Sequence, residues 1–119
     1  MLSDYMGDTE FLLMPAEIDS IVLGAAENSA RSLGFTIATP AKDFLITKSA
    51  PALNRANEEG TIESRRGEIE RNTSELIVFI AREQASAEAG AREITYQHLT
   101  LGLSAFCRRY PDFFPFCTP

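Results

Sequence analysis

The chain of 119 residues carries a net charge of −6 at pH 7, and 45% of its residues are hydrophobic. This length suffices for one domain with its own core, and no apolar run approaches the roughly 18 residues that span a bilayer. The acidic balance opposes nucleic-acid binding, because phosphate recognition depends on an excess of Lys and Arg. We therefore expect one domain over residues 1–119, with no membrane span and no nucleic-acid partner.

The N-terminal stretch and the two cysteines bear on the cellular compartment. Residues 1–15 contain three acidic residues and no basic one, which is unlike a signal peptide. We therefore expect a cytoplasmic protein, in which thiols stay reduced. Cys107 and Cys117 are then free thiols, with a disulfide between them as the alternative.

Helix start and stop signals divide the first half of the chain. Pro15 suits a first helical turn, apolar residues recur at helical spacing after it, and Gly34 is a C-terminal stop. Thr39 as N-cap, with Pro40 in the first helical position, predicts a short second helix. Residues 51–60, PALNRANEEG, have the length of a third helix closed by a glycine.

The second half shows the same signals with stronger helices. Residues 61–73 predict an amphipathic, charge-rich helix, and residues 74–90 predict the strongest helix of the chain, ending in a glycine. The pattern leaves open whether these two segments form one helix or two. Thr95 then caps a last helix over residues 96–107, and three prolines interrupt the tail at 108–119.

An internal repeat emerges when residue 21 is aligned with residue 77. Each copy has a long helix, a glycine, an apolar residue, a threonine and a short helix, which gives repeats at about 15–60 and 61–107. The glycine permits the left-handed turn that ends the long helix, the isoleucine fills the corner, and the threonine caps the next helix. The identical pairs are Ile21/Ile77, Val22/Val78, Ala25/Ala81, Glu27/Glu83, Gly34/Gly90 and Ile37/Ile94.

Residues 90–103, GAREITYQHLTLGL, resemble the repeat motif of the Clp ATPase N-terminal domain. In that motif a glycine, an apolar residue four positions later and a His-Leu-x-Leu-Gly/Ala-Leu run recur. The resemblance implies an all-helical module that binds protein substrates or adaptors, without the ATPase, since no G-x-x-x-x-G-K-[ST] loop is present. The first repeat departs from the motif with Ala41 in place of the histidine, and the second has no room for two closing helices after Cys107. The fold-motif positions are Gly34, Gly90, Ile94, Thr95, His98, Leu99 and Leu101.

The second half is also similar to the histone fold, including the histone-like proteins of bacteria and archaea. Residues 65–90 would be its long central helix, 92–95 its loop strand and 96–106 its last helix. This resemblance implies a homodimer, although His98 stands where that family has an aspartate. The two readings differ at residues 72–74: a Clp-N-like chain breaks its helix there, and a histone-like chain does not.

His98 is the only histidine, and its surroundings decide between chemistry and structure. A catalytic dyad with Cys107 is disfavoured, because their spacing places them on opposite faces of one helix. We expect His98 to pack at the helix corner and to hydrogen-bond the backbone. One histidine and two cysteines form no metal-ligand pattern, and the glutamates fall on solvated helix faces. We therefore expect no enzymatic activity, no metal and no cofactor.

The tail places four aromatic residues close together, Tyr110, Phe113, Phe114 and Phe116. Exposed, they would form a partner-binding or self-association surface. The alternative, which we favour, is that the tail folds back and covers a gap in the core.

Together these patterns predict an all-α domain of two helix-corner-helix repeats. The function that we expect is a small protein-interaction module, binding a peptide or adaptor through the surface between the repeats; a histone-like dimer is the alternative. The predicted core is Ile18, Val22, Leu33, Ile37, Phe44, Leu45, Ile69, Phe79, Ile80, Ile94, Leu99, Leu101 and Leu103.

Overall fold

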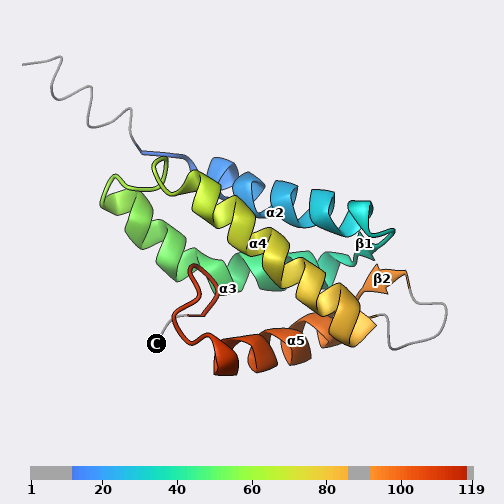
Figure 1. The fold of residues 1–119 in the computed structure, drawn as a ribbon. Coiled ribbons are helices and arrows are strands. Elements are labelled where there is room, and N and C mark those ends of the chain that lie inside the picture. Colours follow the sequence, from blue (N-terminus) through green and yellow to red (C-terminus); the bar gives the residue numbers. More distant parts are fainter. Residues whose placement is uncertain (1–11, 86–91, 118–119) are drawn as a thin grey trace, which may run out of the picture.

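Helices make up most of the described chain, residues 12–85 and 92–117 of a computed structural model, and the fold is all-α (Figure 1). Two short strands join the helices at one end of the molecule. No helix of the described residues is long and apolar enough to cross a bilayer. The elements are α2 (Pro15–Ser32), β1 (Thr36–Ile37), α3 (Thr39–Glu58), α4 (Arg66–Ile80), a π-helical turn η1 (Ala81–Ala85), β2 (Glu93–Ile94) and α5 (Tyr96–Arg109).

Helix α2 begins and ends where the sequence predicts. Pro15 lies in its first turn, and the side chain of Glu17 accepts a hydrogen bond from the backbone N–H of Met14 (2.8 Å). At the other end Gly34 adopts a φ of 84°, a conformation that side chains other than glycine rarely adopt. The N–H of Phe35 then bonds back to the carbonyl of Ala30 (2.8 Å), so the turn into β1 satisfies the helix end.

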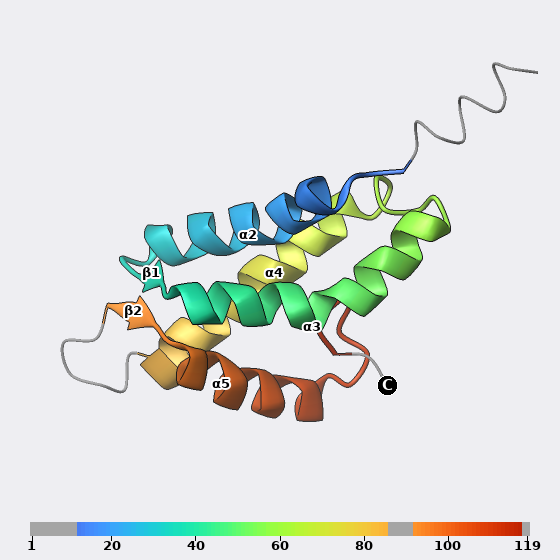
Figure 2. The ribbon, with the colours of Figure 1, turned by 180° about the vertical axis from the view of Figure 1, so that it is seen from behind.

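Helix α3 corrects the prediction of two separate helices around Pro51. One helix of 20 residues runs through the proline, and it bends midway (Figure 2). Leu45 before the proline and Leu53 after it are both buried, so tertiary packing outweighs the lost backbone hydrogen bond. The helix also starts one residue early: Ala38 is the N-cap, and Thr39 lies in the first turn.

Helix α4 does not break at residues 72–74. It continues from Arg66 through Ile80 into η1, and residues 62–65, predicted as helix, form turns instead. The hydroxyl of Thr73 is fully buried and donates to the carbonyl of Ile69 (2.7 Å), whereas a new helix would need it as a cap. The predicted stop at Gly90 lies outside the described residues.

The two corners of the repeat pair with each other. Strands β1 and β2 run parallel, with Ile37 opposite Ile94, the same two residues that the internal alignment matches. The N–H of Thr36 bonds to the carbonyl of Arg92, and the N–H of Ala38 bonds to the carbonyl of Ile94 (both 2.9 Å). The fold thus consists of two helix-strand-helix units, α2-β1-α3 and α4-β2-α5, joined at their strands.

The core lies between α2, α4 and the inner faces of α3 and α5. Most of the predicted core residues are buried, and Leu33, Phe44 and Phe79 are partly buried. Leu101 is a wrong prediction, because 54% of its side chain is exposed. At 100° per residue, Leu101 lies on the side of α5 opposite to Leu99 and Leu103. Buried residues outside the predicted core list include Ile21, Ala26, Ala30, Leu53, Ala56, Ile62, Leu76, Ile77 and Phe106.

Candidate functional site

His98 and Thr95 form a reciprocal cap at the start of α5. The N–H of His98 donates to Oγ1 of Thr95, and the N–H of Thr95 donates to Nδ1 of His98 (both 3.1 Å). The imidazole therefore takes the place that a glutamate side chain has in a capping box. Only 7% of His98 is exposed, so its position at the helix start is structural rather than that of a group facing a substrate.

The two cysteines form a disulfide, which corrects the prediction of free thiols. Cys107 lies in the last turns of α5, and Cys117 lies near the end of the tail, with a Cα–Cα distance of 5.3 Å. The tail turns back after Tyr110 and brings the two together. The sequence analysis inferred the state of the cysteines from the redox compartment alone, although the fold-back of the tail that it favours is what brings them together.

The four aromatic residues of the tail do not form one exposed patch. Phe116 is 1% exposed and belongs to the core, whereas 48% of Tyr110 is exposed. The ring of Phe113 packs edge-on against Phe106, with 4.6 Å between centroids. The tail thus folds back onto the helices, which is the alternative that the sequence analysis favours.

Residues of α4 hold the tail in this position. The guanidinium of Arg65 lies 3.6 Å from the ring centroid of Phe114, and the side-chain amide of Asn72 donates to the carbonyl of Phe114 (2.8 Å). Arg65 also donates from Nε to Glu68 (2.8 Å). This hydrogen bond and the positive charge of Arg65 lower the pKa of the Glu68 carboxyl.

The surface between the two repeats carries an open groove, which we call the α3–α5 groove. One repeat contributes Phe44 and Lys48 from α3, and the volume is about 270 Å³. At its edge the ring of Phe44 meets the exposed ring of Tyr96 edge-on, at 5.4 Å between centroids. The other repeat contributes Thr100, Leu103, Ser104 and Cys107 from α5.

Charge in the α3–α5 groove is of one sign. Among the described residues, Lys48 is the only charged one that lines it, and Arg108 follows one turn after Ser104 on α5. No carboxylate from residues 12–85 or 92–117 lines the groove, although the chain as a whole is acidic. The groove is therefore an apolar surface with a positive edge.

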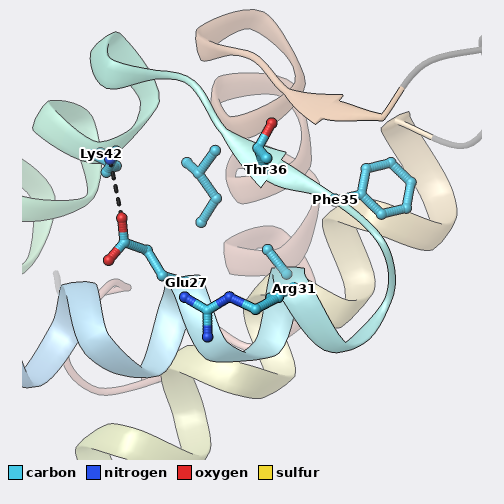
Figure 3. A pocket seen from close by; sticks show the side chains of 7 residues that line it. Glu27, Arg31, Phe35, Thr36 and Lys42 are labelled. Carbon is cyan, nitrogen blue, oxygen red and sulfur yellow. Dashed lines mark hydrogen bonds and ion pairs between the residues drawn. The ribbon is translucent and has the colours of Figure 1, made fainter.

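A second pocket, of about 220 Å³, lies at the corner between α2, β1 and α3 (Figure 3). Its charged groups are already engaged: Lys42 pairs with Glu27 (3.0 Å), and Arg31 donates to Asn28 (2.9 Å). The Glu27–Lys42 pair, drawn as a dashed line in Figure 3, ties the end of α2 to the start of α3. We therefore assign this pocket to the structure of the corner.

The described residues hold no group of three or more His, Cys, Asp or Glu side chains placed to bind a metal ion. The sequence analysis did not name the α3–α5 groove, because its residues come from two distant segments. The only signals were the large apolar side chains of Phe44 and Tyr96 near the two helix starts.

Searches against protein-family models, curated proteins and solved structures gave no match to this chain. The resemblances to the Clp N-terminal repeat and to the histone fold therefore stay hypotheses. The continuous helix α4 lacks the break that the Clp-N-like reading predicts at residues 72–74.

Proposed function

We propose that the chain is a small, non-enzymatic protein-interaction module that binds a peptide segment in the α3–α5 groove. The observation that carries the proposal is the composition of this groove: apolar side chains from both repeats line it, and a large aromatic residue, Tyr96, stands exposed at its edge. Aromatic residues that are exposed beside a groove are typical anchors of protein interfaces. Leu101, on the outer face of the same helix, adds apolar surface next to it.

The ligand that fits the groove is a short acidic segment with an apolar side chain. The apolar side chain would contact Phe44 and Leu103, and a carboxylate would pair with Lys48 at the edge. A partner with excess positive charge would be repelled by Lys48 and Arg108. The protein-binding role also agrees with what the resemblance to the Clp N-terminal repeat implies.

Thr100→Glu should weaken peptide binding, because the new carboxylate projects from the groove wall, repels an acidic ligand and competes with it for Lys48. Peptides are selected from a displayed random library on the wild-type protein, and their affinities are measured by calorimetry. We expect Thr100→Glu to weaken binding about tenfold or more, which corresponds to ~1.4 kcal/mol.

Asn54→Glu is the matched control, since it adds the same charge at an exposed residue of α3 that does not line the groove. It should leave the affinity within about twofold of wild type. Selected peptides that bind Thr100→Glu as well as they bind Asn54→Glu would place the binding site elsewhere. Far-UV circular dichroism verifies that both variants keep their helix content.

The histone-like alternative predicts a dimer, and the packing of α4 argues for a monomer. The apolar face of α4, with Ile69, Leu76 and Ile77, is fully buried within one chain. A single histone fold leaves that face uncovered and has no stable folded monomer. We propose that the protein is monomeric. The unbroken helix α4, in contrast, is an observation that favours the histone-like reading.

Light scattering over a range of concentrations and salt should give a mass near 13.1 kDa throughout. A dimer that persists on dilution would contradict the monomer and favour the histone-like reading, and a DNA-binding assay would follow. The cytoplasmic location stays a prediction. The Cys107–Cys117 disulfide weighs against it, because disulfides persist mainly in oxidising compartments.

A further inference from the structure

The C-terminal tail is bound to the rest of the chain as a peptide ligand is bound to a receptor. We call the residues that receive it the tail-binding surface: Arg65, Asn72 and Phe106. Figure 1 shows the tail turning back from the end of α5 toward α4, which supplies the amide of Asn72. The surface therefore combines residues from two helices that lie far apart in the sequence.

Each contact of the tail-binding surface recognises a different feature of the tail. The side-chain amide of Asn72 donates a hydrogen bond to the backbone carbonyl of Phe114 (2.8 Å), so this contact recognises the main chain of the tail. Arg65 lies over the face of the Phe114 ring (3.6 Å), and Phe106 meets Phe113 edge-on (4.6 Å).

The anchor of the tail is Phe116, which is 1% exposed within the core. Pro115, directly before it, is also buried. A buried aromatic anchor, flanked by an edge-on aromatic contact, a cation–π contact and a backbone hydrogen bond, resembles a short peptide in a binding groove. The segment Phe-Phe-Pro-Phe is thus a ligand whose binding mode is visible in the structure.

The Cys107–Cys117 disulfide makes this ligand a permanent one. It closes the chain over a sequence separation of 10 residues, so the tail cannot leave the surface while the bond is intact. A tethered segment competes with any external ligand through its high effective concentration. The disulfide therefore prevents other peptide segments from binding at the tail-binding surface.

We propose that the tail-binding surface is a docking site for a partner segment in which phenylalanines flank a proline, and that the disulfide keeps the chain's own tail in this site. A dithiol reductant opens this docking site by reducing the disulfide. The dithiol supplies two electrons and two protons, so that the S–S bond is replaced by the thiols of Cys107 and Cys117, and the dithiol itself becomes a disulfide. The released tail then exchanges with a partner's segment. None of Arg65, Asn72 and Phe106 lines the α3–α5 groove, although Cys107 does, and the proposal does not depend on the function proposed for that groove.

The test uses the full chain and a labelled synthetic peptide with the sequence of residues 110–117, carrying serine in place of the cysteine. Fluorescence anisotropy compares oxidised wild type with the Cys107→Ser, Cys117→Ser double variant. We expect the double variant to bind the peptide at a concentration at least about tenfold lower than oxidised wild type does, because loss of the disulfide lowers the effective concentration of the chain's own tail at the surface. Wild type treated with dithiothreitol, a dithiol, should behave like the double variant, and it replaces that variant in the test if the variant fails to fold.

Asn72→Ala shows whether the peptide binds at the tail-binding surface. Introduced into the double variant, or into wild type that is then reduced, it removes the donor to the backbone carbonyl. It should weaken peptide binding about fivefold. The proposal is wrong if oxidised and reduced protein bind the peptide equally, if neither binds it while circular dichroism shows folded protein, or if Asn72→Ala leaves the affinity unchanged.

Discussion

Ile77→Ala is expected to lower the free energy of unfolding by about 3 kcal/mol, because it removes a fully buried side chain from the α2–α4 interface. Ile77 lies in the last turn of α4, and the matching residue of the first repeat, Ile21, is buried on α2. The surrounding residues close only partly over such a cavity, so the cost exceeds the transfer free energy of the lost atoms. Urea denaturation followed by circular dichroism gives the difference from wild type.

Glu75→Ala is the control for this prediction, since Glu75 is exposed on the same helix. Its effect should stay within about 0.5 kcal/mol. A difference below about 1 kcal/mol between the two variants would mean that α4 does not form the centre of the core.

Local signals explain why the helix corners were predictable from the sequence. Gly34 ends α2 in a left-handed turn that other residues rarely adopt, and Thr95 caps α5 with its own hydroxyl. Both depend on residues within one or two turns of the chain. The pairing of Ile37 with Ile94 follows from the repeat, because two similar corners present equivalent strands to each other.

Other features depend on contacts that the sequence does not display. In the sequence, Pro51 predicts a helix boundary. Leu45 and Leu53 on either side of it are buried, however, and this packing keeps α3 a single continuous helix. Leu101 reads as core because it stands in a run of leucines. Only the orientation of α5 decides that its neighbours Leu99 and Leu103 face inward instead.

The α3–α5 groove and the disulfide likewise depend on contacts that the sequence does not display. Phe44 and Tyr96 lie in different repeats and become neighbours only when the strands pair. Cys107 and Cys117 are close in sequence, but an extended tail would separate them. The disulfide requires the tail to turn back, and the burial of Phe116 favours that turn.

Phe116→Ala should lower the free energy of unfolding by about 3–4 kcal/mol, even with the disulfide intact. Phe116 is among the largest fully buried side chains, and no residue of the tail other than Phe116 is both aromatic and fully buried. Its removal leaves a cavity that the rest of the tail cannot fill, because Phe113 and Phe114 are already engaged with Phe106 and Arg65. Urea denaturation under oxidising conditions measures this loss.

Tyr110→Ala is the matched control, since Tyr110 is a half-exposed aromatic residue of the same tail. Its loss should cost about 1 kcal/mol, from the contact with the ring of Phe106 at 5.0 Å. Equal effects of Phe116→Ala and Tyr110→Ala would mean that the tail does not enter the core in solution. The tail aromatics would then form an exposed surface, which is the partner-binding alternative that the sequence left open.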